Sequence, residues 1–468
     1  MTVYQIKRLS LFALFMLITG SVDSIRNLPA TALFGSTLVF FLIVSAITFL
    51  IPSALVSAEL GSTWTKEGGI YNWVRFAFGE KWGFLAVWFQ WINTVIWYPT
   101  VLSFMAGTLA SLFDPSFPSL AQNKFYLVGF ILTVCWALTL VNLRGLHVSA
   151  KFTSFCSLIG MIIPMFLIIF LAGVWFFLGK PVQVHLTSDD ILPHLSLGSE
   201  NWISLTAIMA AFLGMELTAV HVNRIEDPHK NFPIAMGAAV VFILFTMTIG
   251  SLAIAWVLPK DEINLTSGIM QAFTNFFDAF HLSWMIPVIA IMILIGSIGG
   301  TINWIISPAK GLLQAAQSGY LPKFFQQENK HGVAANILIV QALIVSVVCL
   351  LFLFMPSVNG SYWLLTALTT EVYMIVYVIM FIAAIRLRYK FPHIERPFKI
   401  PGGNYGMWIV GLLGLVGCAV TLTVGFFPPS GIDVGSHLRY VVIFTTGLIL
   451  MVLPIFLFYG YRVFSTKS

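Results

Sequence analysis

Charged side chains are scarce in this sequence. Its 468 residues include 24 Lys and Arg and 18 Asp and Glu, which together make up 9% of the chain. Soluble globular domains carry about 25% charged residues, so this composition excludes a soluble globular domain. The high apolar content excludes a disordered chain, and it argues against a nucleic-acid-binding protein.

Cysteine is also rare, and no cofactor motif is present. The four cysteines, Cys135, Cys156, Cys349 and Cys418, each lie inside an apolar run, which indicates packing rather than a disulfide framework or a metal cluster. The absence of a phosphate-binding loop argues against ATP-driven transport. No nucleophile has a base beside it, so no enzyme activity and no cofactor are expected.

Apolar residues make up 59% of the chain, and they are concentrated in long runs. A membrane-spanning helix needs about 20 such residues, and the runs do not alternate with period two as barrel strands do. The gaps between them are too short for a soluble domain. The sequence therefore predicts an all-α polytopic membrane protein with 12 transmembrane helices, near residues 9–33, 36–58, 82–112, 125–143, 152–178, 202–223, 234–258, 284–306, 334–356, 362–385, 407–427 and 440–460.

The loops differ in basic residues, and this difference predicts the orientation. With the N-terminus in the cytoplasm, nineteen Lys and Arg fall on the inside and four fall on the outside, at Lys124, Lys180, Lys260 and Arg439. Cytoplasmic loops carry the excess of basic residues, so both termini are expected in the cytoplasm. The net charge of +6 then reflects topology and needs no nucleic acid. A cleaved signal over residues 9–18 is the alternative, but its removal would invert the count.

Two spans are interrupted by residues that a lipid-facing helix does not carry. Charged groups and unwound backbone at membrane depth are tolerated where they line a cavity. The interruptions predict a substrate site made of Gly20, Ser21, Val22, Asp23, Ser24 and Arg26 in the first span and of Phe212, Leu213, Gly214 and Glu216 in the sixth. The alternative is that Gly20 and Gly214 only mark kinks or close helix packing.

The five-span separation of the interruptions suggests an internal repeat. Inverted five-helix repeats would occupy residues 1–178 and 200–390, with two further helices over 405–463. In transporters built in this way, paired broken helices hold the substrate near the midplane. Free N–H groups at a helix N-terminus attract an anionic group, and free carbonyls at a helix C-terminus attract an ammonium. A zwitterionic amino acid therefore fits such a site.

The loop after the sixth span contains Glu226-Asp227-Pro228-His229-Lys230-Asn231-Phe232-Pro233-Ile234-Ala235. It resembles the signature of amino-acid permeases of the amino acid–polyamine–organocation superfamily. Residues 67–74, 318–322 and 396–403 resemble other loops of that family. Residues 221–223 and 262–271 are similar to the bacterial glutamate/γ-aminobutyrate antiporters.

This resemblance implies a leucine-transporter-type fold and alternating access in a bacterial inner membrane. It implies a secondary transporter, most simply an antiporter, whose partners are an amino-acid substrate, a counter-substrate and the lipid bilayer. Whether the protein forms a homodimer stays undecided. A proton-coupled symporter or a channel is the alternative function. Substrate contacts are implied at Val22, Asp23 and Ser24 in the first break, at Gly214 and Glu216 in the second, and at Trp304 and Tyr373. Some proton-coupled relatives place a Lys in the fifth helix, where this chain has Gly160.

Charges inside the spans lead to a hypothesis about the substrate. Asp23 and Arg26 are three residues apart and are expected to pair if the intervening turn is helical. Glu216 is expected to be held against the broken backbone. Glu371 is left without a partner, so it is protonated, faces water or faces a cation. The last option predicts a preference for neutral or cationic amino acids over glutamate.

Two further sets of residues are expected to act outside the substrate site. Glu226, Asp227, Pro228 and Lys230 are predicted to form a cytoplasmic gating turn, in which the prolines restrict the backbone. Glu59, near the inner end of the second span, is expected to serve as an ion-pair partner or a helix cap.

Overall fold

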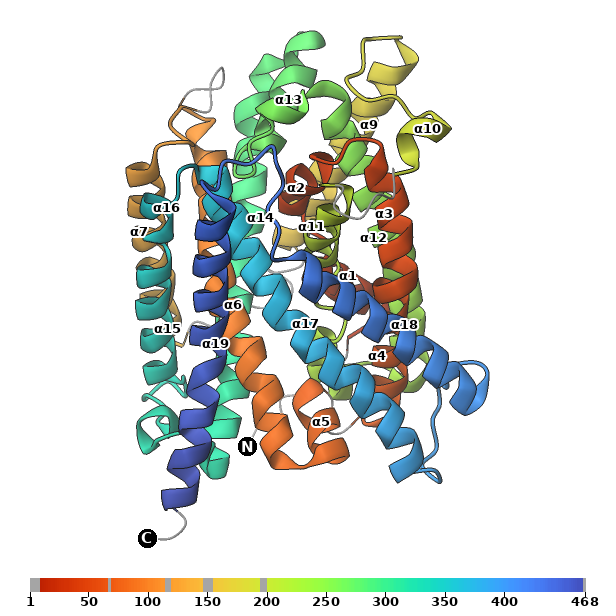
Figure 1. Ribbon diagram of the computed structural model, residues 1–468, viewed down its shortest axis with the longest axis vertical. Helices are drawn as coiled ribbons and strands as arrows, with labels where there is room; N and C mark the ends of the chain where they lie inside the picture. Colours follow the sequence, from red (N-terminus) through yellow and green to blue (C-terminus); the bar gives the residue numbers. More distant parts are fainter. Residues whose placement is uncertain (1–8, 66–68, 114–118, 146–154, 194–199, 466–468) are drawn as a thin grey trace.

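A computed structural model describes residues 9–65, 69–113, 119–145, 155–193 and 200–465. Glu67 and Gly68 of the second resembling loop lie outside these ranges, as do residues 1–8. Within the described part every element is a helix (Figure 1). The first half contains α1 (Leu11–Val22), η1 (Ile25–Asn27), α2 (Leu28–Ala32), α3 (Thr37–Ser45), η2 (Ala46–Leu50), α4 (Ile51–Thr63), α5 (Ile70–Phe78), α6 (Glu80–Ala110), α7 (Lys124–Leu143), η3 (Leu158–Ile162), α9 (Ile163–Phe177), α10 (Ser188–Ile191), η4 (Glu200–Ile203), α11 (Ser204–Ala211) and η5 (Leu217–Arg224).

The second half contains fewer and longer helices. They are α12 (Pro228–Val257), η6 (Lys260–Glu262), α13 (Gly268–Ala279), η7 (Ser283–Met285), α14 (Ile286–Ala315), η8 (Ala316–Tyr320), η9 (Lys323–Gln326), α15 (Ala335–Val348), α16 (Leu351–Phe354), α17 (Val358–Lys390), α18 (Gly403–Val424) and α19 (His437–Ser465).

Ten helical segments of the described chain are long and apolar enough to cross a membrane, against the twelve spans expected. The expected span over 82–112 forms the 31-residue helix α6. Its four tryptophans and its polar residues lower its mean hydropathy, and most of its residues are buried, so it does not need an apolar surface toward lipid. The expected span over 202–223 is divided into α11 and η5, and neither part is long enough to be counted.

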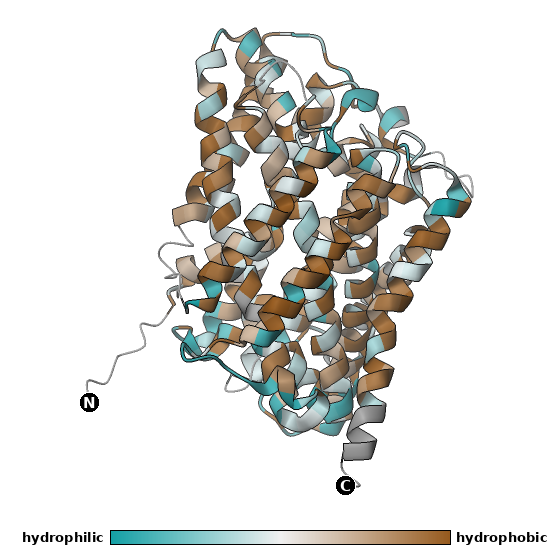
Figure 2. Ribbon diagram, turned by 90° about the vertical axis from the view of Figure 1, so that its left-hand side faces the viewer, coloured by the Kyte–Doolittle hydropathy of each residue, from teal (hydrophilic) through white to brown (hydrophobic). Residues whose placement is uncertain are grey.

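Polar and apolar surfaces are arranged as a membrane protein requires. Hydrophilic residues gather at the two ends of the bundle, and hydrophobic residues cover its sides (Figure 2). Large apolar side chains of outer helices are exposed there, among them Phe170 on α9, Val241 on α12 and Leu457 on α19. Such a surface is favourable against lipid and unfavourable against water. The chain is therefore a multi-pass membrane protein.

Helix α17 runs through the middle of the bundle. In its most apolar stretch, 83% of the residues are buried, compared with 17% in α19 at the periphery. It packs against α6, α5, α11 and α18, and α6 in turn packs against α14. Helix α5 and the C-terminal end of α19 lie at one end of the molecule, whereas α10 and α13 lie at the opposite end (Figure 1). The end with α5 therefore carries loops that the basic-residue count assigns to the cytoplasm, and the end with α10 and α13 carries loops that it assigns to the outside.

A buried ionic cluster joins α4 to α17 and to the loop before α18. The Arg388 guanidinium donates to Glu59 through Nε at 2.6 Å and through Nη2, and Arg396 Nε lies 3.3 Å from Glu59 Oε1. The backbone N–H of Ile400 donates to Glu59 Oε2 at 2.9 Å. Glu59 is thus an ion-pair partner, as predicted. It anchors the loop over 396–403 that resembles the permease family.

Candidate functional site

Both expected interruptions are present in the backbone. Helix α1 ends at Val22, and Ser24 is extended, with φ −151° and ψ 123°. Helix α11 ends at Ala211, and Gly214 has φ +112°, a conformation that side chains other than glycine rarely adopt. A Cβ atom built on Gly214 would lie 3.0 Å from the carbonyl oxygen of Ser21. The two breaks therefore meet, and glycine allows the close approach.

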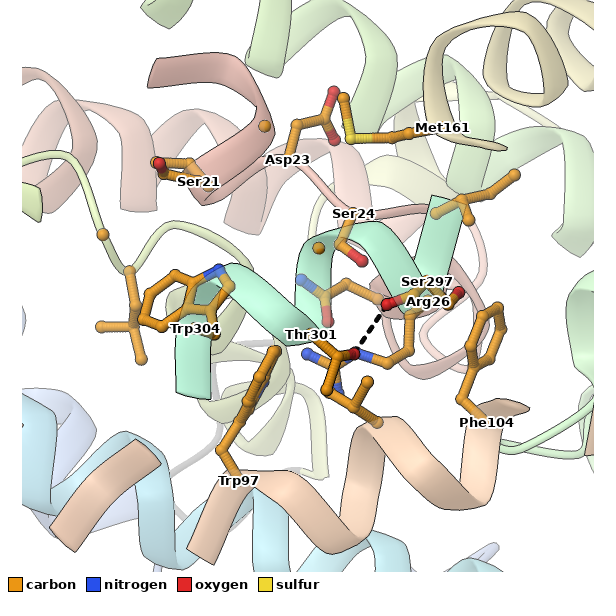
Figure 3. A pocket seen from close by; sticks show the side chains of 18 of the residues that line it. Ser21, Asp23, Ser24, Arg26, Trp97, Phe104, Met161, Ser297, Thr301 and Trp304 are labelled. Atoms are coloured by element: carbon orange, nitrogen blue, oxygen red, sulfur yellow. Dashed lines mark hydrogen bonds between the residues drawn. The ribbon is translucent and has the colours of Figure 1, made fainter. Parts of the chain in front are cut away.

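A cavity lies beside this meeting point, with about 1180 Å³ of space between atoms that includes some open solvent. Its walls come from the first break, α6, the segment around η3, the second break, α14 and α17 (Figure 3). The predicted site residues on these walls are Gly20, Ser21, Val22, Asp23, Ser24, Arg26, Leu213, Gly214, Trp304 and Tyr373. Phe212, Glu216 and Glu371 are not among the lining residues.

Glu216 lies behind the cavity wall and is held by hydrogen bonds. The Tyr373 and Tyr377 hydroxyls each donate to one of its carboxylate oxygens at 2.5 Å, and Gln90 Nε2 lies 3.5 Å away. The Tyr377 hydroxyl also accepts the backbone N–H of Gly214 at 2.9 Å. Glu216 is therefore tied to the second break through Tyr377. Its place is consistent with the structural role that the sequence suggested.

Glu371 points away from the cavity. Its carboxylate lies against α18, where a Cβ atom on Gly425 would overlap Glu371 Oε1. Within the described residues, neither of its carboxylate oxygens has a hydrogen-bond partner. Residues of α17 that line the cavity are Thr366, Thr369 and Tyr373, spaced three and four positions apart on one helix face. Glu371 is two positions from Tyr373, about 200° around the helix, so it faces the other side.

Asp23 and Arg26 do not form the ion pair that the sequence suggested. Asp23 Oδ2 accepts from Thr246 Oγ1 of α12 at 2.7 Å. Arg26 Nη1 donates to Thr100 Oγ1 at 3.1 Å and to the Tyr362 hydroxyl at 3.0 Å. The pairing required a helical turn between the two residues, and the extended backbone at Ser24 removes that turn. Both residues line the cavity, but Asp23 Oδ1 is fully enclosed and, within the described residues, has no hydrogen-bond partner.

Two tryptophans form an aromatic wall of the cavity. The rings of Trp97 on α6 and Trp304 on α14 lie 5.4 Å apart with an interplanar angle of 42° (Figure 3). The Arg26 guanidinium carbon lies 5.3 Å from the centre of the Trp97 ring. A cation over an aromatic face is stabilised by the ring quadrupole. The wall thus helps to hold Arg26 in place.

Much of the cavity wall comes from unbroken helices, and most of its residues there were not predicted from the sequence. Helical spacing is the signal that identifies them, because they follow positions that repeat every three or four residues. These residues are Asn93, Thr94, Trp97, Val101, Phe104, Ser157, Gly160, Met161, Gly296, Ser297, Gly300, Thr301, Thr366 and Thr369. Ile25, Asn27 and Ala210, which flank the two breaks, were also missed. On α14, Ser297 and Thr301 lie seven and three positions before the predicted residue Trp304, so they share its face of the helix.

The predicted gating turn caps α12. Asp227 precedes the helix in a left-handed conformation with φ 43°, and Pro228 is its first residue. The Asp227 carbonyl accepts the N–H of Lys230 at 3.2 Å. The turn is also paired with the segment before α1, because the Glu226 N–H donates to the carbonyl of Leu9 at 3.0 Å. These residues lie outside the cavity, and their gating role stays a prediction.

No metal-binding group is present in the described ranges, where three or more His, Cys, Asp or Glu side chains nowhere come together. The polar groups of the cavity are hydroxyls, amides, one carboxylate and one guanidinium. Such groups can bind a small polar molecule with both charges.

A comparison with protein families decides which kind of protein carries this cavity. The model of a family described as amino acid permease matches residues 9–449. The chain belongs to the amino acid permease family. This permease is accordingly a membrane transporter of small molecules rather than an enzyme.

Relatives of the permease cover nearly its whole length. An uncharacterized transporter of Legionella pneumophila is 40% identical over 452 residues, covering 97% of this chain and 96% of its own. A glutamate/gamma-aminobutyrate antiporter of Lactococcus lactis subsp. lactis is 30% identical over 456 residues, with 96% and 90% covered. A Lactococcus lactis protein described as "Probable agmatine/putrescine antiporter" is 26% identical over 403 residues, with 85% and 83% covered.

Proposed function

We propose that this permease is an amino-acid antiporter that works by alternating access. The observation that carries the proposal is the cavity beside the two meeting breaks, which has Asp23 and Arg26 on its wall. An amino acid carries a carboxylate, which complements the Arg26 guanidinium, and an ammonium, whose N–H groups can donate to the hydroxyl and amide oxygens of the wall. The antiporter names of two relatives support exchange as the mode of transport.

The mechanism follows the predicted inverted repeats over 1–178 and 200–390, with the helices of 405–463 outside them. Alternating access needs a site between two parts that move relative to each other. The contact between Ser21 and Gly214 supports this mechanism, since each residue belongs to a different proposed repeat. We further propose that the protein lies in the bacterial inner membrane with both termini in the cytoplasm, as the excess of basic residues on one side favours.

The proposed substrate is a zwitterionic amino acid of no net charge. The preference for cationic amino acids rested on Glu371, which does not line the cavity. Apart from Asp23, no acidic side chain lines the cavity in the described part of the chain, so the wall does not favour a cation. The names of the relatives include both acidic and cationic substrates and do not favour one class.

Counterflow into proteoliposomes tests the proposal. Purified permease would be reconstituted into vesicles that are either empty or loaded with unlabelled amino acid, and uptake of each of the twenty labelled amino acids and of common amines would be measured. An antiporter requires internal substrate, so we expect uptake into loaded vesicles and little into empty ones. Equal uptake into empty vesicles would contradict antiport. Uptake into empty vesicles that requires an inward proton gradient would indicate symport instead.

Homodimer formation stays a prediction from the sequence. Light scattering during size-exclusion chromatography of the protein in detergent measures it directly.

A further inference from the structure

Arg26 is a buried cation without a partner of opposite charge. It is 9% exposed and lines the cavity. Among the residues that the structure describes, no carboxylate pairs with it. Its partners are the neutral groups of Thr100 and Tyr362 and the ring of Trp97. A guanidinium does not lose its charge in proteins, so the cation cannot be removed by deprotonation.

The hydrogen bonds of Arg26 leave one edge of the guanidinium open. Both acceptors, Thr100 and Tyr362, are bound by the same nitrogen, Nη1. Within the described chain, Nε and Nη2 have no acceptor, and neither of them belongs to the fully enclosed unpaired atoms. These two nitrogens form the edge that matches the two oxygens of a carboxylate.

Arg388 shows how the same edge is used elsewhere in this protein. Its Nε and Nη2 both donate to the carboxylate of Glu59, while its Nη1 is buried without a partner. Arg26 has the reverse arrangement, because its Nη1 is bonded and its Nε and Nη2 are open. Since an unpaired buried charge is strongly unfavourable, the open edge on a cavity wall calls for an anionic group from the ligand.

We propose that Arg26 is the carboxylate-recognition residue of the cavity, so that the permease selects substrates with a carboxylate and rejects the amines formed by their decarboxylation. This inference rests on the proposed function, since it assigns the substrate class of the same cavity. On this basis the carboxylate alone favours arginine over agmatine and ornithine over putrescine, whichever side chain the cavity prefers. Glutamate and γ-aminobutyrate both keep a carboxylate and are both compatible with Arg26.

Competition between matched pairs tests the assignment. Arginine against agmatine, and ornithine against putrescine, differ by one carboxylate each. They would compete with the labelled amino acid that the wild-type permease exchanges fastest. We expect the carboxylated member of each pair to compete at least tenfold better. In Arg26→Gln, the apparent affinity for the carboxylated member should fall by about 10- to 100-fold, because hydrogen bonds to a charged group are lost. The apparent affinity for the amine should not fall.

Two further variants complete the design. Arg26→Lys keeps the charge and loses the bidentate edge, so it should weaken the carboxylated substrates severalfold and leave the amines unchanged. If Arg26→Gln does not fold, the result with Arg26→Lys decides whether Arg26 recognises the carboxylate. Arg386→Gln makes the same change as Arg26→Gln at an exposed position of α17 and should leave the competition unchanged.

Two results would overturn the assignment. In the first, amines compete as well as their amino acids in the wild type. In the second, the folded Arg26 variants keep the wild-type discrimination. Failure of exchange in the wild type would refute the proposed function alone, because thermal stabilisation of the purified protein by the same pairs measures carboxylate recognition without transport.

Discussion

Tyr377 joins two polar groups at the second break. Its hydroxyl donates to Glu216 and accepts the backbone N–H of Gly214. Both groups are buried, and a buried polar group without a partner costs about 1–3 kcal/mol. The conformation of this break therefore depends on one hydroxyl group of α17.

Removal of that hydroxyl should destabilise the permease. We expect Tyr377→Phe to lower the free energy of unfolding by about 1–3 kcal/mol and to slow exchange, because Gly214 and Glu216 each lose a partner. Thermal unfolding in detergent, followed by size-exclusion chromatography, measures the first effect. Tyr405→Phe is the matched control, since Tyr405 is 85% exposed. Equal melting temperatures for the two variants would refute the role of Tyr377.

Two charged residues show the limit of prediction from sequence at this scale. Asp23 and Arg26 were identified as unusual because charge is rare inside a span. Their partners Thr246, Thr100 and Tyr362 were not, because a hydroxyl on a distant helix carries no distinguishing signal in the sequence. The direction of Glu371, in contrast, could have been predicted. Its position two residues before Tyr373 on a continuous helix places the two side chains on opposite faces.

At the scale of elements, η3 and α14 are in backbone contact. A Cβ atom built on Gly160 would lie 2.2 Å from the Cα atom of Gly296. The helices can approach so closely because both residues lack a side chain. A Lys at position 160 would not fit between these helices in this arrangement.

The contact predicts opposite effects for two glycine substitutions. Gly160→Ala should destabilise the protein by about 1–3 kcal/mol, as overpacking does. Gly173→Ala should be neutral or stabilising by about 0.5–1 kcal/mol, because a Cβ atom there meets nothing within 4 Å and alanine favours the helix. The difference between the two melting temperatures is the readout. A Gly160→Ala variant as stable as Gly173→Ala would mean that the helices are not in contact.

The Glu59 cluster links three elements and should respond strongly to mutation. Glu59→Gln removes the charge that compensates Arg388 and Arg396, and breaking a buried ion pair costs about 3–5 kcal/mol. We expect a poorly folded protein, visible as aggregation on size-exclusion chromatography. Glu395→Gln removes an exposed carboxylate from the same loop and should behave like the wild type. A monodisperse Glu59→Gln protein with unchanged melting temperature would contradict this prediction.

Element positions were predictable where local composition carries the signal. The two breaks were located because Gly, Asp, Arg and Glu interrupt apolar runs, and the structure interrupts its helices there. An ion-pair role for Glu59 was predictable from its place near the inner end of a span, but its partners Arg388 and Arg396, more than 300 positions away, were not. Helix α6 was predicted as a span, yet burial in the bundle lets it carry tryptophans and polar residues that lower its hydropathy. Its contribution to the cavity wall depends on packing, which a single sequence does not specify.

At the scale of the whole molecule, the two broken segments share one backbone attachment. The Leu9 N–H donates to the carbonyl of Arg224 at 2.7 Å, and the Glu226 N–H donates back to Leu9 at 3.0 Å. Leu9 precedes α1, Arg224 is the last residue of η5, and Glu226 lies between η5 and the turn at Asp227. These two hydrogen bonds therefore connect the turn to both broken segments.

This attachment gives a prediction for the turn. Asp227→Ala should lower the exchange rate severalfold and leave the apparent affinity nearly unchanged, because the residue lies outside the cavity and alanine is disfavoured at φ 43°. Asp227→Gly tolerates the conformation and should restore the rate if backbone strain is the cause. Asp261→Ala, an exposed acid in η6, serves as the control. An unaltered rate in Asp227→Ala would rule out a gating role.

The long-range partners of the first span also bear on how the protein is made. Asp23 is bonded to Thr246, and Arg26 is bonded to Tyr362, which follows it by 336 positions. Ribosomes synthesise the chain from the N-terminus, so the nascent first span reaches the membrane well before either partner exists. Before α12 and α17 are inserted, Asp23 lacks Thr246, and Arg26 has only Thr100 of α6 among its hydrogen-bond partners. Completion of the first span is therefore a late event in biogenesis, although its residues are translated first.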